Sequence, residues 1–148
     1  MEIRTFEFDS ATYLDSLEIR DEVLRKPLGM SIYNDNLDMD KTDFHIGAFQ
    51  NGKLVGSLIL HPLPDGEIKM RQVAVRSQLQ SLGIGKAMIA FAESFASEKS
   101  FSKMVLNARK VVLGFYEKHG YETVGEEFLE VGIPHFKMKK HLAPNPDN

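Results

Sequence analysis

Two glycines and a lysine, Gly83, Gly85 and Lys86, stand at the start of a helix-like stretch, just after the strand-like run 68–75 and its loop. The first amides of a helix lack intrahelical partners and the helix dipole is positive there, so this position favours an anion. Glycines remove the Cβ atoms that would keep a phosphate away from those amides. Lys86 opposes the dipole, which suggests that an anion lies between them. The pattern predicts a phosphate-binding loop.

Two familiar phosphate-binding loops do not fit this stretch. A P-loop requires a glycine five residues before its Gly-Lys pair and then Ser or Thr, but the sequence has Gln80 and Ala87 there. A dinucleotide fingerprint requires a third glycine where the sequence has Met88. Both loops are excluded, and a tight turn that binds no ligand stays open as the alternative.

Near the end of the chain, a histidine and a glutamate are candidates for proton transfer. His135 follows Gly-Ile-Pro at the start of the last predicted strand, and Glu130 ends the strand before it, so a hairpin would set them side by side. Such a group can accept the proton of a nucleophile. Two alternatives stay open: His135 takes that proton, or it braces the turn. Glu67, which opens the central strand, is a second candidate for the base.

The other histidines and acids give no sign of a metal site. His45 and His61 lie at predicted strand edges, where a lone histidine usually has a structural role. No histidine pair has a metal-ligand spacing such as His-Glu-x-x-His. The acidic stretch 35–43 lacks the glycine and the closing glutamate of a calcium loop. The sequence has no cysteine, which excludes disulfides, thiolate metal sites and a cysteine nucleophile. We therefore expect no metal.

Length and charge restrict the partners of the protein. The 148 residues fit a single domain over residues 1–148, with a frayed tail at 143–148. The net charge of −3 and the scattered basic residues argue against nucleic acid. No apolar stretch approaches the ~20 residues that span a bilayer, and the N-terminus lacks a signal pattern, so we expect a cytoplasmic protein that does not bind membranes.

Periodic apolar patterns predict an α/β (α+β) fold. The predicted strands cover residues 2–8, 44–50, 54–64, 67–75, 103–108, 121–131 and 134–142. The predicted helices lie between a cap at Asp9 or Ser10 and Pro27, over 84–99 and over 111–120, with one short helix in the polar segment 28–43. Asn51-Gly52 and Asp65-Gly66 predict hairpin turns between the central strands.

The stretch Gln80-Ser81-Leu82-Gly83-Ile84-Gly85 resembles the Gln/Arg-x-x-Gly-x-Gly/Ala loop of the GNAT superfamily of acyl-CoA N-acyltransferases. "MRQVAV" precedes it like the central strand of that family, and "FYEKHGYE" resembles its Phe/Leu-Tyr-Glu-Lys-x-Gly-Phe/Tyr segment. The ending "FLEVGIPHFKM" is similar to a bacterial subgroup that includes the ElaA and YjcF proteins. The resemblance covers residues 2–142 and implies a mixed, mostly antiparallel sheet of 6–7 strands flanked by helices.

The resemblance implies acetyl-CoA as cosubstrate. Its pyrophosphate would bind the amides of residues 80–86, its pantetheine would pair with the central strand, and an amide near Val73 would face the thioester oxygen. Arg109 replaces an Asn or Gln that contacts the cofactor in many members, and Asn107 cannot simply inherit that role. The implied cofactor-binding residues are Gln72, Val73, Ala74, Val75, Gln80, Ser81, Leu82, Gly83, Ile84, Gly85, Lys86 and Arg109.

The resemblance also implies a catalytic role for Tyr116, which stands where the family often keeps a tyrosine near the sulfur of CoA. A phenol can protonate the departing thiolate, and the alternative is a tyrosine packed in the core. With Tyr116, Glu130 and His135 as the catalytic candidates, we expect acetyl transfer to an amine by direct attack in a ternary complex. A non-catalytic acyl-CoA sensor and an interaction module are the alternatives.

The acceptor is a small-molecule or peptide amine that the sequence does not identify. Four acids of the segment 28–43, namely Asp35, Asp38, Asp40 and Asp43, are placed to attract a cationic amine or to form a solvated loop. The oligomeric state is open as well, with a homodimer among the states considered.

Overall fold

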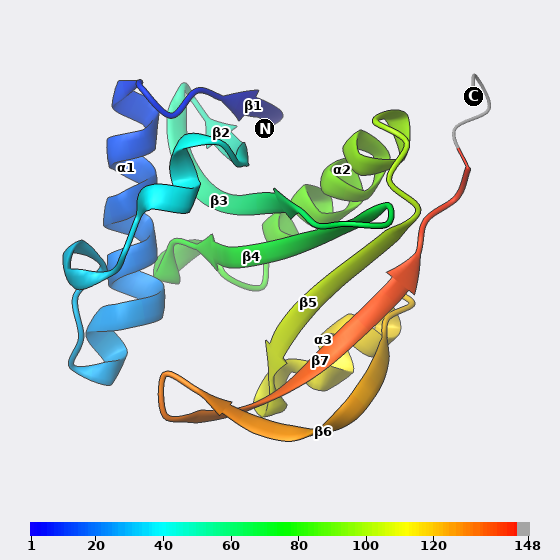
Figure 1. Cartoon of the computed structure of the whole chain (residues 1–148). Helices are drawn as coiled ribbons and strands as arrows, with labels where there is room; N and C mark the ends of the chain where they lie inside the picture. Colours follow the sequence, from blue (N-terminus) through cyan, green and yellow to red (C-terminus); the bar gives the residue numbers. More distant parts are fainter. Residues whose placement is uncertain (145–148) are drawn as a thin grey trace. The chain divides into compact units, whose positions relative to one another are not determined.

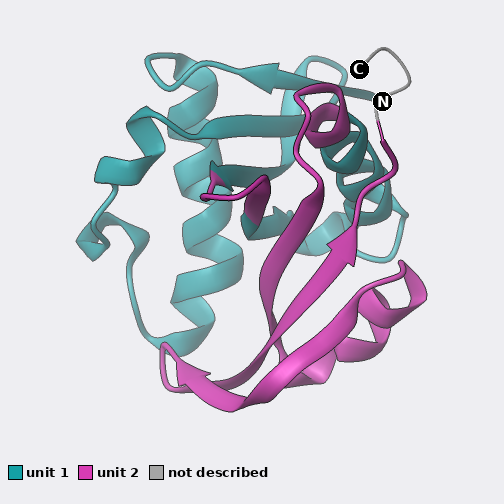
Figure 2. Cartoon of the chain, turned by 45° about the vertical axis from the view of Figure 1, so that its right-hand side comes forward, with its two compact units in different colours: residues 1–61, 70–94 teal, residues 62–69, 95–148 magenta. Residues whose placement is uncertain are grey.

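A computed structural model describes residues 1–144, which form two compact units (Figure 2). The first unit comprises residues 1–61 and 70–94, and the second comprises residues 62–69 and the chain from residue 95 onward. The single-domain assignment stays a prediction. Of its predicted frayed tail, residues 145–148 lie outside the described part, whereas the carbonyl of Ala143 accepts a hydrogen bond from the Ser97 hydroxyl.

The first unit combines antiparallel strands with two helices (Figure 1). Its strands are β1 (Glu2–Phe6), β2 (Phe44–Gln50), β3 (Lys53–Pro62) and most of β4 (Glu67–Val75), and its helices are α1 (Ala11–Arg20) and most of α2 (Ile84–Glu98). The Ser10 hydroxyl caps α1 by accepting a hydrogen bond from the Tyr13 amide. A core of apolar side chains joins α1 to these strands: Phe6, Tyr13, Leu17, Ile19, Ile32, Phe49, Leu54 and Ala74.

The two predicted hairpin turns are confirmed. Asn51 and Gly52 both have positive φ angles between β2 and β3, and Asp65 and Gly66 both have them between β3 and β4. The β2–β3 register shifts by one residue between Ala48 and Phe49, which marks a β-bulge.

The segment after α1 differs from its prediction. The α-helix gives way to a π-helical turn at Asp21–Arg25 and a 3-10 turn at Lys26–Leu28. The expected single short helix over 28–43 is replaced by two 3-10 turns, Ile32–Asn34 and Asp38–Lys41. The buried Asp21 carboxylate accepts a hydrogen bond from the Ile32 amide. A side chain thus satisfies a backbone amide that a longer helix would have paired with a backbone carbonyl.

The second unit contains β5 (Lys103–Arg109), α3 (Leu113–Lys118), β6 (Glu122–Glu130) and β7 (Ile133–His141). β7 pairs antiparallel with both β5 and β6. The start of β4 pairs in parallel with β5 from Glu67↔Lys103 to Lys69↔Val105. Along β6 the register shifts between Val124 and Phe128, at the left-handed residue Gly125.

The hydrogen-bonded order of the seven strands is β1-β2-β3-β4-β5-β7-β6. The sheet is mixed and mostly antiparallel, which confirms the predicted fold class. Within residues 1–144, no helix is both long enough and apolar enough to cross a membrane.

Candidate functional site

The glycine-rich loop turns sharply into α2. Ser81 and Gly83 both adopt left-handed backbone conformations, with φ angles of 71° and 82°, and α2 begins at Ile84. The Gln80 side chain donates a hydrogen bond of 3.1 Å to the carbonyl of Val75, which ties the loop to the end of β4. The backbone therefore accounts for a glycine at position 83, because a side chain there would be strained.

Gly85 has no such explanation. Its φ is not left-handed, and a Cβ built on it would lie 3.9 Å from Val75 Cγ2, which is an ordinary contact. A glycine inside a helix costs about 1 kcal/mol relative to alanine. Neither packing nor backbone strain therefore requires a glycine at position 85. Lys86 beside it is exposed.

The central strand carries a strained residue. Gln72 has a φ of 55° in the middle of β4, a conformation that non-glycine residues rarely adopt. Its side-chain oxygen accepts a hydrogen bond of 3.3 Å from Nε of the buried Arg20. Such conformations cost about 1–3 kcal/mol, and they cluster at functional sites. Gln72 thus interrupts β4 directly before Val73, the expected donor to the thioester oxygen.

A buried ionic network surrounds Asp40, for which a cationic-amine site and a solvated loop were the two expectations. The Asp40 carboxylate accepts hydrogen bonds from the Tyr13 hydroxyl at 2.6 Å and from Arg20 Nη1 at 2.9 Å. Arg71 Nη1 lies 3.4 Å from its other oxygen. Burial alone would raise the pKa of Asp40, but these hydrogen bonds and the charges of Arg20 and Arg71 outweigh burial and lower it. Burial and the bond to Asp40 raise the pKa of Tyr13 to about 12.

Arg71 extends this network to a histidine. Arg71 Nη1 donates to one oxygen of Asp43 at 2.9 Å, and the other oxygen lies 2.7 Å from Nδ1 of His61. His61 was expected to be a structural histidine, and the sequence analysis did not detect its carboxylate partner. His45 matches its structural expectation, because its buried ring contacts the Asp40 carbonyl through Nε2 at 2.7 Å.

Arginines bind most of the acids in the segment 28–43. Asp40 and Asp43 are buried beside Arg20 and Arg71, and Asp35 forms a two-pronged pair with Arg25. Asp38 is exposed. The solvated acidic loop that was one alternative is therefore wrong for Asp40 and Asp43. Because the guanidinium groups balance the carboxylates, this cluster has little net charge with which to select a cationic acceptor.

In the second unit, the β6–β7 hairpin brings Glu130 and His135 together as predicted. Glu130 Oε2 lies 3.5 Å from His135 Nε2, and Nδ1 of the same ring lies 2.8 Å from the carbonyl of Ile133. Glu130 also accepts a hydrogen bond from the Asn107 amide. The imidazole is buried, so the bracing contact of one alternative is present, while the catalytic assignment of His135 and Glu130 stays a prediction.

Tyr116 is buried in α3, where its ring makes an edge contact with Tyr121 at 5.7 Å between centroids. Burial raises the pKa of Tyr116 to about 12, so the phenol is protonated at neutral pH and can donate a proton. Arg109 ends β5 opposite His135 in the register with β7.

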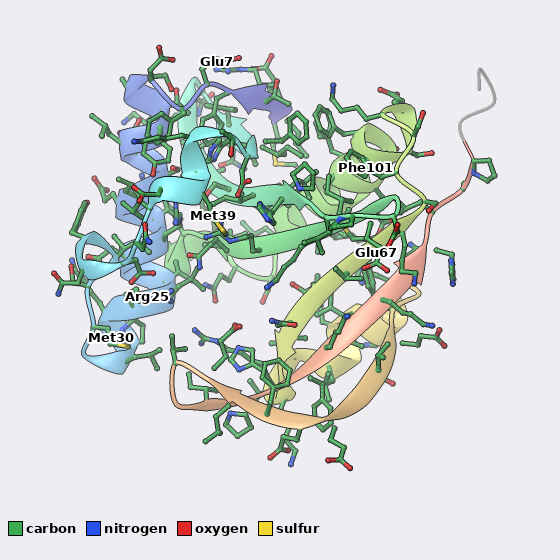
Figure 3. The ribbon with its side chains drawn as sticks, in the orientation of Figure 1. Glu7, Arg25, Met30, Met39, Glu67 and Phe101 are labelled. Carbon is green, nitrogen blue, oxygen red and sulfur yellow. The ribbon has the colours of Figure 1, made fainter. Side chains whose placement is uncertain are left out.

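Not all of the expected site residues fall in one unit. The expected residues of β4 and of the glycine loop belong to the first unit, because that unit includes residues 70–94. The second unit contains Arg109, Tyr116, Glu130 and His135. Glu67, the second candidate base, lies at the start of β4 (Figure 3) and pairs with Lys103 at 3.2 Å. Within residues 1–144, no group of three or more His, Asp or Glu side chains is placed to hold a metal ion.

Comparison with known proteins shows the family of this chain. The acetyltransferase (GNAT) domain family matches residues 18–142. The chain is 31% identical to the uncharacterized N-acetyltransferase YjcF of Bacillus subtilis over 127 residues, which cover 85% of this chain and 90% of YjcF. The chain belongs to the GNAT acetyltransferase family. The family assignment made from the glycine loop is thus confirmed.

Solved structures of GNAT proteins share the fold. Escherichia coli ElaA superposes with a TM-score of 0.81 at 20% identity, over 95% of this chain and 99% of ElaA. An aminoglycoside 6'-N-acetyltransferase complexed with coenzyme A superposes with a TM-score of 0.79 at 18% identity, over 99% of this chain and all of that chain (100%). At these identities the likeness concerns the GNAT fold.

Proposed function

We propose that this GNAT protein is an acetyl-CoA-dependent N-acetyltransferase that acetylates an amine of a small molecule or peptide. Gly85 is the observation that carries the proposal. It is a helical glycine that neither backbone conformation nor packing requires, and it lies beside an exposed lysine at a helix N-terminus. The coenzyme A complex of a neighbour with the same fold supports coenzyme A as the ligand. The family assignment supports acyl transfer.

The expected cofactor-binding residues and Tyr116 each have a role in this proposal. The amides of residues 80–86 bind the pyrophosphate, and Lys86 adds a positive charge to it. Residues 72–75 of β4 lie along the pantetheine, with the Val73 amide as the donor to the thioester oxygen. Tyr116 protonates the departing thiolate. Arg109 contributes to cofactor binding. Because the chain has no cysteine to carry an acyl group, the amine attacks the thioester directly.

The test of this function is acetyl transfer itself. Purified protein is incubated with acetyl-CoA and a panel of monoamines, polyamines, aminoglycosides and peptides, and released thiol is measured. We expect acetyl-CoA to bind and at least one amine to release thiol well above the rate without acceptor. Coenzyme A binding without transfer to any amine would indicate the acyl-CoA sensor, and absence of binding would indicate the interaction module.

Replacing Gly85 with valine is expected to weaken coenzyme A binding by tenfold or more, because the new side chain fills the space through which the pyrophosphate reaches the helix amides. Tenfold corresponds to about 1.4 kcal/mol. Titration calorimetry measures the dissociation constant, and circular dichroism measures the fold. Position 85 gives a cleaner test than position 83, where any side chain would also strain the backbone.

Ala90→Val is the matched control for this substitution. It places the same branched side chain on an exposed position farther along α2, away from the glycine loop. Its coenzyme A affinity should equal that of the wild type. Equal affinity in a folded Gly85→Val variant would show that the loop is a turn without a ligand.

Replacing His135 with phenylalanine is expected to lower the melting temperature by several degrees. The ring volume is kept, but the Ile133 carbonyl and Glu130 lose their partner, at a cost of about 1–3 kcal/mol for a buried hydrogen bond. Turnover per folded molecule should change little if the ring only braces the hairpin. If the melting temperature is unchanged and the acidic limb of the pH–rate profile is lost, His135 instead accepts the proton of the amine.

A further inference from the structure

His61 is held by a carboxylate that the fold places opposite to it. In the β2–β3 ladder Phe44 pairs with Leu60, so the next pair outward sets Asp43 opposite His61. The Asp43 side chain is 1% exposed, and its oxygens contact His61 Nδ1 and Arg71 Nη1 at 2.7 and 2.9 Å. An ionised carboxylate only accepts hydrogen bonds, so Nδ1 carries the proton of this contact. In the neutral ring, Nε2 therefore holds the lone pair.

The ring of His61 is partly exposed. Its side chain is 28% exposed, and Nε2 has no hydrogen-bond partner among residues 1–144. The rings of His45 and His135 differ in this respect. Both are buried, and their Nε2 atoms face the Asp40 carbonyl and the Glu130 carboxylate. His61 thus combines a carboxylate-held Nδ1 with an Nε2 that no described residue bonds, on a partly exposed ring, and this arrangement suits a general base.

The partner of His61 is connected to the strained part of β4. Arg71, which fixes the second oxygen of Asp43, directly precedes Gln72 with its left-handed backbone. Val73, the proposed donor to the thioester oxygen, follows Gln72. A chain of contacts therefore runs from His61 through Asp43 and Arg71 to the segment where the thioester would lie. All of these residues belong to the first unit.

The charges around Asp43 nearly balance. The charged groups of this cluster are the carboxylates of Asp43 and Asp40 and the guanidinium groups of Arg71 and Arg20. His45, the remaining titratable ring on β2, binds the Asp40 carbonyl. Two carboxylates are thus set against two guanidinium groups, so the cluster has little net charge beside the imidazole.

We propose that His61 is the general base that takes the proton of the acceptor amine, with Asp43 and Arg71 as positioning residues. This inference rests on the proposed acetyltransferase function. As the amine nitrogen bonds to the acetyl carbon, Nε2 accepts a proton from that nitrogen and Asp43 stabilises the imidazolium. The carbon–sulfur bond breaks, and the thiolate takes its proton from Tyr116. Exchange with water then removes the proton from His61 and returns one to Tyr116.

The test is the pH dependence of kcat/KM for His61→Gln with any amine that the wild type acetylates. We expect turnover to fall by roughly 10²–10⁴, the usual contribution of a general base. The acidic limb, which arises because histidine changes its charge between about pH 5 and 8, should disappear. Coenzyme A affinity and melting temperature should not change. His141→Gln, at an exposed end of β7, is the control and should behave like the wild type.

Asp43→Asn tests the positioning role separately. The amide no longer fixes the tautomer, so turnover should fall while the acidic limb remains, because the imidazole of His61 is still present. Imidazole added to His61→Ala should restore part of the activity, which a purely structural role would not allow. In ¹⁵N spectra of the wild type, His61 should be the Nδ1–H tautomer at high pH.

Several results would overturn the assignment. His61 is not the base if His61→Gln turns over as fast as the wild type and keeps the acidic limb. The same follows if the spectra show an Nε2–H tautomer. Either result leaves the acetyltransferase proposal unaffected. Absence of thiol release from the wild type with every amine of the panel would remove both proposals together. The two failures are therefore distinguishable.

Discussion

Replacing Asp40 with alanine is expected to lower the free energy of unfolding by about 3–5 kcal/mol, the usual cost of removing one partner from a buried ion pair. The Arg20 and Asp40 side chains are 1% and 0% exposed, so the substitution leaves a buried guanidinium without its carboxylate. The Tyr13 hydroxyl loses its acceptor as well. For a chain of this size the loss corresponds to a decrease of about 6–20 °C in melting temperature.

Thermal and urea unfolding of Asp40→Ala measure this effect. Asp38→Ala is the matched control, because Asp38 is exposed in the same 3-10 turn and its loss should change stability by less than about 0.5 kcal/mol. Equal stabilities of the two variants would show that the buried network does not stabilise the fold.

The same carboxylate makes stability depend on pH in acid. The folded protein lowers the pKa of Asp40 below its ordinary value of 3.8, so the unfolded chain binds its proton first as the pH falls. The stabilisation is therefore complete above pH 3.8 and is lost as the pH falls through the folded pKa. Asp40→Asn should lack this contribution and lose less stability than the wild type between pH 5 and the acid limit.

Replacing Tyr116 with phenylalanine is expected to lower kcat by roughly 10²–10⁴, as for loss of a general acid, with little change in coenzyme A affinity. Because burial raises the pKa of Tyr116 to about 12, the wild-type phenol keeps its proton throughout the neutral range. The ring and its contact with Tyr121 remain in the variant, so the fold should be preserved.

Steady-state kinetics of Tyr116→Phe are compared with those of Tyr121→Phe, which removes the same hydroxyl from the neighbouring ring. The control should keep its turnover within a few fold. An undiminished rate in Tyr116→Phe would show that this tyrosine only packs in the core, and that the thiolate leaves without help from an acid.

Local signals were sufficient to predict most elements. The Asn51-Gly52 and Asp65-Gly66 turns require left-handed residues that few other pairs supply, and the cap at Ser10 depends on a contact within one helical turn. The prediction for the segment 28–43 failed because its conformation depends on two residues that precede it. Asp21 accepts a hydrogen bond from the Ile32 amide, and Arg25 pairs with Asp35. Propensity within the segment carries no information about those contacts.

The glycine loop could be predicted from the sequence, whereas the Asp43–His61 contact could not. The loop is one contiguous stretch, so its glycines could be recognised directly. The pairing of Asp43 with His61 depends on the bulge between Ala48 and Phe49. Counting outward from the Asn51-Gly52 turn without that bulge would set Thr42 opposite His61, because one inserted residue changes every later pair. A single sequence does not reveal the bulge, so His61 was taken for an isolated histidine.

The outermost strand β6 has a consequence for aggregation. It is nine residues long and lies at one end of the strand order, where unpaired backbone groups invite a strand from another molecule. Its exposed side chains include Glu122, Glu126 and Glu127, and the break in its ladder at Gly125 prevents continuous pairing along its length. An incoming copy would meet like charges and a kinked template. These features oppose the pairing of β6 with a strand of another molecule. Replacing these three glutamates with uncharged residues should therefore increase aggregation.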